Sequence, residues 1–206
     1  MNREEMLRKL RAGEDPLDLS IEKWKDIVNH LKSIRRASDF DDNLEAHGDN
    51  CALCEVHESC HSCPVYKRTG RENCGGTPYW EFRLAWRRYD LKAMRIAGER
   101  ELEFLISLRK QLKTKKKFEN ILQFLDGKLK LGKKLTNDDI TKLIEIDNFA
   151  QEHNLPELHE KVAKIIVSIE KTIPAEEVEL KEGEIKKLSE NVVIRKRKDN
   201  MIEIEW

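Results

Sequence analysis

Residues 51–80 read CALCEVHESCHSCPVYKRTGRENCGGTPYW, and every cysteine of the chain falls within this segment. A disulfide framework would distribute cysteines along the chain, because the stabilisation rises with the length of the closed loop. Two Cys-x-x-Cys pairs in one short segment instead indicate a metal site, since each pair presents two thiolates to one ion. The candidate ligands are any four of Cys51, Cys54, Cys60, Cys63 and Cys74.

The spacing of the pairs restricts the choice of ligands. Five residues separate the two pairs, which is short for a ribbon-type zinc finger, so one cysteine of the second pair can point away while Cys74 closes the site. His57 and His61 lie between the cysteines but are less favoured, because histidines in such a loop more often lie at the surface. The first choice of ligands is Cys51, Cys54, Cys63 and Cys74, and the second replaces Cys74 with Cys60.

Zinc is the metal expected first, because four thiolates close a tetrahedral structural site. A [4Fe–4S] cluster is the alternative, since it also takes four thiolates and Pro64 follows Cys63 as proline follows the last cysteine of ferredoxin runs. The Cys-x2-Cys-x5-Cys spacing also resembles the cluster-binding end of certain RecB-like nucleases. The chain before Cys51 is too short and too helical for a nuclease core. A disulfide or a metal-free segment is the third possibility.

Hydrophobic periodicity predicts helices on both sides of the cysteine segment. Ser20 is expected to cap the second helix, and Thr77 with a proline at N1 is expected to start a long one that bends at Gly98. The helices of this half are expected over residues 3–12, 20–34, 78–116 and 118–126.

The sequence after residue 127 predicts an αα-hairpin, because a short link joins two amphipathic segments, 137–153 and 156–172. Thr136 is a suitable N-cap for the first of them. A small antiparallel sheet is expected after residue 174, with one hairpin turning at 182–183 and another at 199–200. In its simplest register Lys196 faces Glu203 and Val193 faces Trp206.

These elements define an α+β fold class that is mainly helical. Residues 1–126 are expected to pack helices around a cysteine-metal knot at 51–79. Residues 127–206 are expected to hold the αα-hairpin and the C-terminal β-hairpins.

Composition excludes several classes of protein. The 206 residues carry 39 Lys+Arg and 39 Asp+Glu, so the formal net charge is zero and the chain is not polycationic. There is neither the run of about 20 apolar residues that spans a bilayer nor the apolar core of a signal peptide, so a cytoplasmic location without membrane association is expected. Abundant Lys and Glu with few Gln are typical of hyperthermophile proteins.

Four motifs together resemble a known group of sequences. They are DPLDLSIEKWKDI at 15–27, CALC at 51–54, CHSCPVY at 60–66 and CGGTPYW at 74–80. In this order they resemble uncharacterised cysteine-rich proteins of phages, archaeal viruses and related mobile elements. The resemblance spans about residues 13–108, and it implies that all five cysteines belong to the motif. It leaves a host origin and a viral or mobile-element origin both open.

Basic residues form local clusters although the formal net charge of the chain is zero. They surround the cysteines and recur near residues 109–117, where they are candidates for phosphate contacts. The alternative interpretation is a set of solvated faces on a Lys/Glu-rich chain. The residues expected to bind nucleic acid are Lys67, Arg68, Arg71, Arg109, Lys113, Lys116 and Lys117.

Catalytic motifs are missing from the sequence, which contains no HExxH, no GxSxG and no phosphate-binding loop. A non-enzymatic accessory or regulatory protein is therefore expected, in which a structural zinc site presents a surface for nucleic acid or protein. The alternatives are an iron–sulfur protein with a redox or nucleic-acid-processing role and a purely structural interaction module.

Overall fold

The chain divides into two compact units, which are described separately. In the computed structural model, residues 1–41, 44, 50–172, 185–189, 192–196 and 202–205 are described. Unit 1 comprises Met1–Lys113 and unit 2 comprises Thr114–Trp206. The division falls within a single helix, α6 (Leu91–Lys130), as does the boundary expected after residue 126.

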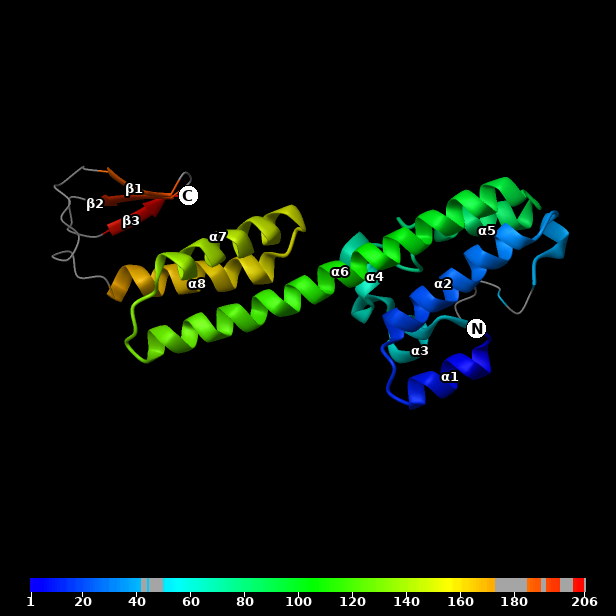
Figure 1. The fold of residues 1–206 in the computed structure, drawn as a ribbon, viewed down its shortest axis with the longest axis horizontal. Helices are drawn as coiled ribbons and strands as arrows, with labels where there is room; N and C mark the ends of the chain where they lie inside the picture. The colour runs from blue at the N-terminus through cyan, green and yellow to red at the C-terminus, as the bar shows by residue number, and fades with distance from the viewer. Residues whose placement is uncertain (42–43, 45–49, 173–184, 190–191, 197–201, 206) are drawn as a thin grey trace. The chain divides into compact units, whose positions relative to one another are not determined.

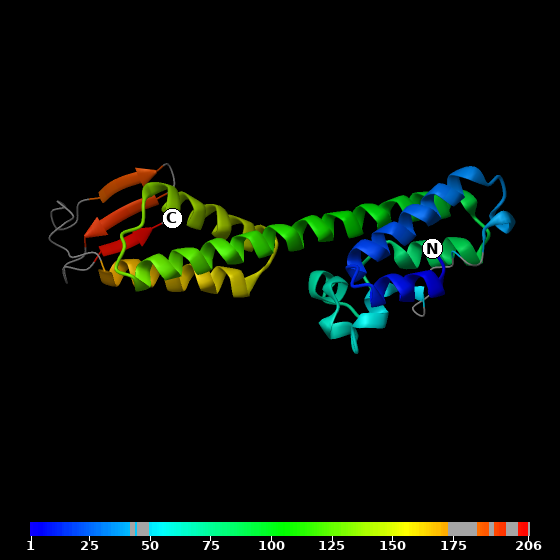
Figure 2. The same cartoon turned by 60° about the horizontal axis from the view of Figure 1, so that its bottom comes forward.

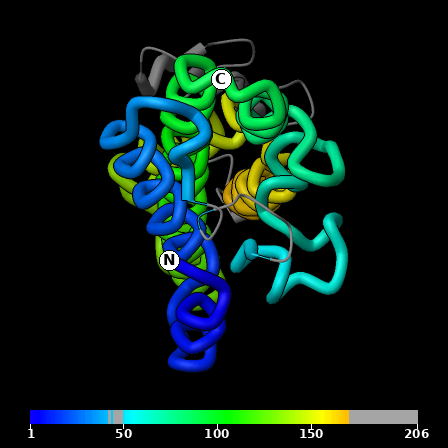
Figure 3. Tube along the Cα trace, turned by 90° about the vertical axis from the view of Figure 1, so that its right-hand side faces the viewer, coloured from blue at the N-terminus to red at the C-terminus, as the bar shows by residue number. Residues whose placement is uncertain are grey.

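Unit 1 is built from helices connected by short irregular segments (Figure 1). Within it, α2 and α6 lie side by side (Figure 3). Arg95 on α6 donates hydrogen bonds to the C-terminal carbonyl oxygens of Leu31 and Ile34 of α2, at 2.9 and 2.8 Å. The elements that precede α6 are α1 (Arg3–Arg11), α2 (Pro16–Ser33), η1 (Ala37–Asp39), α3 (Ala52–Val56), η4 (Cys60–Ser62), α4 (Pro64–Thr69) and α5 (Tyr79–Arg87).

Helix α2 begins earlier than expected. Its N-cap is Asp15, whose carboxylate accepts hydrogen bonds from the backbone N–H groups of Leu17 and Asp18 at 2.9 and 3.1 Å. Ser20 lies inside the helix and donates to the carbonyl oxygen of Pro16. The Ser20 cap is therefore wrong, because Asp at N-cap followed by Pro at N1 is a stronger helix start upstream.

The long helix expected over 78–116 is two helices. Helix α5 ends at Arg87, and Tyr89 adopts a left-handed conformation with φ of 53° before α6 begins. Asp90 then accepts a hydrogen bond from the backbone N–H of Ala93, which caps α6. Gly98, the expected bend, lies within α6 close to α2, where an added Cβ would stand 3.4 Å from Leu31. The segment 118–126 is a continuation of α6.

The core of unit 1 joins α2, α5 and α6. Phe82 of α5 is 1% exposed and packs edge-on against Trp24 of α2, with ring centroids 5.1 Å apart. The centroid of the Phe40 ring lies 6.1 Å from that of the Phe82 ring. Met94 of α6 is fully buried. The cysteine segment joins this core through Leu53, Cys63 and Val65.

Unit 2 packs the C-terminal part of α6 against α7 (Asn137–Glu152) and α8 (Pro156–Thr172), as Figure 2 shows. The expected αα-hairpin is confirmed, and Asn154 turns the chain with a φ of 50°. The buried residues of this core are Leu122, Leu125, Leu143, Ile146, Ala150, Leu158, Val162, Ile165 and Ile169.

The N-terminus of α7 carries a buried acidic capping box. Thr136 is the N-cap, as expected, and accepts from the Asp139 N–H at 3.3 Å while Asp139 accepts from the Thr136 N–H at 2.9 Å. Lys128 donates to both carboxylate oxygens of Asp139, at 3.0 and 2.8 Å. Burial raises the pKa of Asp139, but the hydrogen bonds from Lys128 and Thr136 outweigh it, and the pKa falls below its usual value.

We expect Asp139→Asn to lower the free energy of unfolding of unit 2 by about 1.5–3 kcal/mol at pH 7, the range for a hydrogen bond to a charged group. Because the pKa of Asp139 is lower in the folded than in the unfolded chain, its stabilisation is present above the unfolded value. It is lost as the pH falls through the folded value. Chemical denaturation at neutral and acidic pH checks this. If the difference in the free energy of unfolding between wild type and variant is the same at acidic as at neutral pH, the prediction is contradicted.

The expected α+β class is wrong, because the described part of the chain is mainly helical and the described cores are built from helices and the segments that connect them. Beyond α8, three short strands pair antiparallel in the order β1-β2-β3. They are β1 (Ile185–Ser189), β2 (Val192–Lys196) and β3 (Ile202–Glu205). Among the described helices, none is long and apolar enough to cross a membrane.

The register of the last two strands also differs from expectation. Arg195 lies opposite Glu203 and Ile194 opposite Ile204, one position away from the pairing expected for Lys196 and Val193. Both registers place a basic residue opposite Glu203, so charge pairing alone could not select between them. The first strand expected before residue 182 and both expected turns lie outside the described residues.

Candidate metal centre

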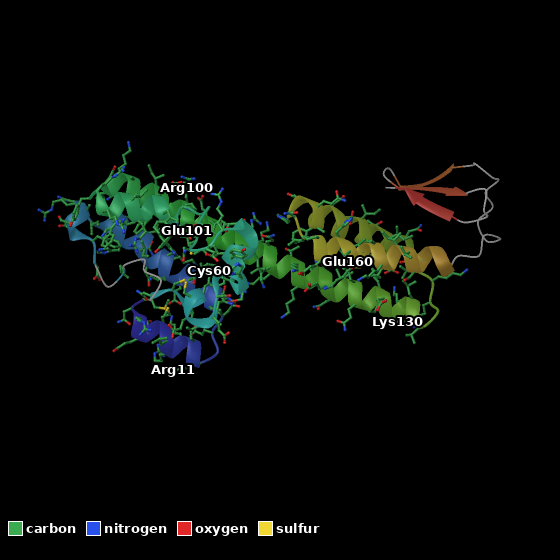
Figure 4. All side chains as sticks on the ribbon, turned by 180° about the vertical axis from the view of Figure 1, so that it is seen from behind. Arg11, Cys60, Arg100, Glu101, Lys130 and Glu160 are labelled. Atoms are coloured by element: carbon green, nitrogen blue, oxygen red, sulfur yellow. The ribbon has the colours of Figure 1, made fainter. Side chains whose placement is uncertain are left out.

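All five cysteines line one cavity of about 460 Å³ in unit 1. Its walls come from α2, the segment from residue 50 to 80, and α6. Figure 4 labels two of its side chains, Cys60 from η4 and Glu101 from α6. Residues spread over the whole cysteine segment therefore share a single pocket, and all five cysteines are free thiols.

Cys51 occupies the N-cap position of α3. The Cys54 thiol donates a hydrogen bond to it, and this contact lowers the pKa of Cys51 to about 6, with further hydrogen bonds from the backbone N–H groups of Cys54 and Leu53. The pKa of Cys54 is strongly raised by the same contact, so this thiol keeps its proton. The hydrogen bond within the first Cys-x-x-Cys pair therefore favours the thiolate form of one of its two sulfurs, the form in which sulfur binds metals.

Cys63 repeats this arrangement at the start of α4. It is the N-cap of that helix, with Pro64 at N1, and it is 9% exposed. Burial raises the pKa of the Cys63 thiol, whereas hydrogen bonds from the backbone N–H groups of Val65 and Tyr66 oppose the rise. Burial is the larger effect, so the Cys63 thiol keeps its proton more readily than an exposed cysteine does.

Cys74 lies on a tight turn in which Asn73 and Cys74 both have positive φ, 54° and 56°. The turn is fixed by Thr77, whose hydroxyl donates to the Cys74 carbonyl oxygen at 3.0 Å, and by Trp80, whose indole donates to the Asn73 carbonyl oxygen at 2.8 Å. Burial and the neighbouring Cys51 raise the pKa of Cys74 to about 12. Such a strained turn places the thiol in the cavity at an energetic cost that a bond to sulfur would offset.

Cys60 is partly buried, as Cys51 and Cys74 are. It begins the short 3-10 helix η4, and its thiol lies 4.0 Å from the Asn73 side-chain oxygen. His57 lines the cavity, but His61 does not. The ring of His61 packs on Tyr66 with centroids 4.5 Å apart, and its side chain is 64% exposed.

Two charged residues that the sequence interpretation missed also line the cavity. Lys23 of α2 is 4% exposed and donates to the Asn50 carbonyl oxygen. Glu101 of α6 is 3% exposed and accepts from the Tyr79 N–H at 3.0 Å; burial raises its pKa to about 7. Glu101 had a signal in the sequence, because it occupies a position of the apolar stripe that contains Met94, Ala97, Leu105 and Leu108.

The thiols share the cavity without converging on one point. Within the described residues, no group of three or more His, Cys, Asp or Glu side chains is arranged to hold a metal ion. The cysteine chemistry fits a thiolate centre, but an ion shared by four sulfurs would require their side chains to rotate inward from the positions described.

The close approach at Gly75 gives the site a testable packing constraint. A Cβ at this position would meet the Arg71 Cβ at 2.9 Å and the Glu72 carbonyl oxygen at 3.0 Å. We expect Gly75→Ala to destabilise unit 1 by about 1–3 kcal/mol, because the loop must shift away from the overpacked atoms. Chemical denaturation measures this.

Gly127→Ala is the matched control, since nothing lies within 4 Å of its Cβ and the position is helical. Alanine is there expected to be neutral or slightly stabilising. Equal effects of the two substitutions would contradict the packing constraint.

The residues expected to bind nucleic acid belong to both units. Arg109 is engaged within unit 1, where it pairs with Asp15 at 3.1 Å and with Asp18, and Arg68 donates to Gln111. Arg71 lines the cysteine cavity. The exposed members are Lys67, Arg68, Arg71 and Lys113 of unit 1 and Lys116 and Lys117 of unit 2.

Comparisons of the chain with family models, curated proteins and solved structures found no match. The resemblance to cysteine-rich phage and archaeal-virus proteins therefore stays a prediction.

Proposed function

We propose that the cysteine segment is a structural zinc centre that fixes unit 1 of a non-enzymatic accessory protein. Cys51, Cys54, Cys63 and Cys74 are the proposed ligands. The observation that carries the proposal is that every thiol of the chain lines one cavity, with Cys51 and Cys63 at the starts of two short helices. Cys60 is left out because the short spacer between the two Cys-x-x-Cys pairs lets one cysteine of the second pair point away, and Cys63 is the more buried of that pair.

The need for a metal follows from the size of the segment. Helices α3 and α4 contain only five and six residues, far fewer than the roughly 12–15 that an isolated helix needs in water. The segment is anchored to the core by only a few apolar side chains, chiefly Leu53 and Val65. A bound zinc would join both helices and the Cys74 turn, and so supply the missing folding free energy.

Cobalt substitution tests this proposal directly. Adding Co²⁺ to metal-free protein should give the intense visible bands of tetrahedral thiolate coordination, and Zn²⁺ should displace them at one equivalent. Chelation should lower the melting temperature of unit 1. Absence of tetrahedral bands, together with a melting temperature that is indifferent to chelator, would overturn the proposal.

An iron–sulfur cluster is the second candidate, and one observation favours it. In a [4Fe–4S] cluster each thiolate binds a different iron, so the sulfurs need not meet at one point. The cavity of about 460 Å³ is far larger than a single ion needs, and its thiols line the walls without converging. Inorganic sulfide in anaerobically purified protein separates this candidate from zinc.

A further inference from the structure

We propose that the turn between α5 and α6 binds single-stranded nucleic acid, with the Tyr89 ring stacking on a base and Arg87, Arg88 and Lys92 contacting phosphates. None of these residues is among those that the sequence predicted to bind nucleic acid. The inference goes beyond the proposed zinc centre and rests on different residues.

The backbone at Tyr89 is the first observation. The Asp90 N–H donates to the Ala85 carbonyl oxygen and the Tyr89 N–H to the Trp86 carbonyl oxygen, both at 3.0 Å. These bonds form a helix C-terminal motif whose left-handed position usually holds glycine. Tyrosine at φ of 53° is strained there.

Packing does not compensate for this strain. The Tyr89 side chain is the most exposed aromatic of the described residues, at 71%. Its ring has no ring contact, hydrogen bond or cation–π partner in the described part of the chain. A strained residue with an exposed aromatic face is suited to a contact outside the chain, and every nucleic-acid base has a face on which such a ring can stack.

The charges around the turn are the second observation. Arg87, Arg88 and Lys92 are exposed, and among the described residues none of them has a hydrogen bond or ion pair. Most other cations of the same unit are engaged, for example Arg100 with Glu81 and Lys32 with Glu99. Unpaired guanidinium groups beside an aromatic ring match the phosphates and bases of a single strand.

Arg35 is a further unpaired cation near the start of α6. Arg95 of α6 donates to the carbonyl oxygens of Leu31 and Ile34, and Arg35 follows Ile34 in the chain. The Arg35 side chain is exposed and has no described partner. Three acidic side chains in these segments already have partners: Asp90 caps α6, Asp39 pairs with Arg36, and Glu99 pairs with Lys32.

Fluorescence anisotropy of the full chain with a labelled oligothymidylate and an oligouridylate of equal length tests the inference. A duplex of the same length and polyglutamate are the competitors. We expect both single strands to bind, with an affinity that falls as salt rises. Polyglutamate binding as tightly as the oligonucleotides, or a preference for the duplex, would overturn the proposal.

Tyr89→Gly is the decisive variant, because it removes the ring and relieves the backbone strain. We expect the melting temperature to rise while affinity for the single strands falls by about 5-fold or more. Tyr89→Phe should retain binding, since it keeps the ring. Unchanged affinity of Tyr89→Gly would overturn the stacking role, and this variant excludes unfolding as the cause of any loss.

The cations need a matched pair of variants. Arg87→Gln with Arg88→Gln should weaken binding and reduce the slope of log affinity against log salt by about 0.7 for each phosphate that the protein no longer neutralises. The control is Lys113→Gln with Lys116→Gln and Lys117→Gln, which should keep the wild-type affinity. Weaker binding by the control with unchanged binding by the arginine variant would overturn the proposed surface.

Metal content separates this inference from the proposed function. Wild-type protein that binds oligonucleotide but holds no metal would support the turn surface and overturn the zinc centre. Protein that holds zinc but binds no single strand at low salt would overturn the turn surface alone.

Discussion

Replacing Cys51 by serine is expected to abolish metal binding and to unfold the cysteine segment of unit 1. Cys51 is the N-cap of α3, and its thiolate accepts hydrogen bonds from the Cys54 thiol and from backbone N–H groups. A serine hydroxyl keeps the cap but is not a soft anionic ligand for zinc. Because structural zinc contributes about 10–16 kcal/mol in small zinc-finger peptides, removing a ligand should dominate the stability of this segment.

The loss of zinc affinity is expected to exceed the roughly 10–100-fold effect of changes outside the ligand set. Competition with a chromophoric chelator measures it. Cys60→Ser is the matched control, because it makes the same chemical change at the cysteine that the first ligand set leaves out. We expect it to retain zinc. Loss at Cys60 with retention at Cys74 would replace the first ligand set by the second.

Phe82→Ala is expected to lower the free energy of unfolding of unit 1 by about 3–5 kcal/mol, the range for deleting a buried aromatic ring. Phe82 is 1% exposed and touches Trp24 and Phe40, so the cavity left by alanine would open between α2 and α5. This loss is comparable to the whole stability of many small domains. Urea denaturation followed by tryptophan fluorescence measures it.

Leu84→Ala on the same helix is the control for Phe82. Leu84 is 48% exposed, so its truncation removes little buried surface and should change stability by less than about 0.5 kcal/mol. If the two substitutions cost the same, the described core of unit 1 would be wrong.

Local signals account for the parts of the fold that could be predicted. Thr136 followed by acidic residues identified the start of α7, and the link before Pro156 identified the αα-hairpin, because capping and helix breaking depend on neighbouring residues. The break at Tyr89 could not be predicted, since tyrosine is not a residue that favours positive φ. The α+β class failed because a change to strand periodicity near the C-terminus was given the same weight as the helical pattern of the preceding residues, which make up most of the described chain.

The candidate site was predicted only in part. The five cysteines were assigned to one site because thiols with Cys-x-x-Cys spacing have few other uses, and the structure places all five in one cavity. Glu101 was missed because the stripe expected on this helix was read from apolar residues alone, and Lys23 was missed because its partner Asn50 is distant in sequence. The pairing of Arg109 with Asp15 could not be predicted, because it depends on tertiary packing.

The metal content of protein purified without oxygen, measured together with inorganic sulfide and free thiols, tests the central claim most directly. We predict one zinc per chain, no sulfide, and four thiols protected from alkylation until a chelator is added. Stoichiometric iron with sulfide would replace zinc by a cluster. Five freely reactive thiols and no bound metal would contradict the claim that this cavity is a thiolate metal centre.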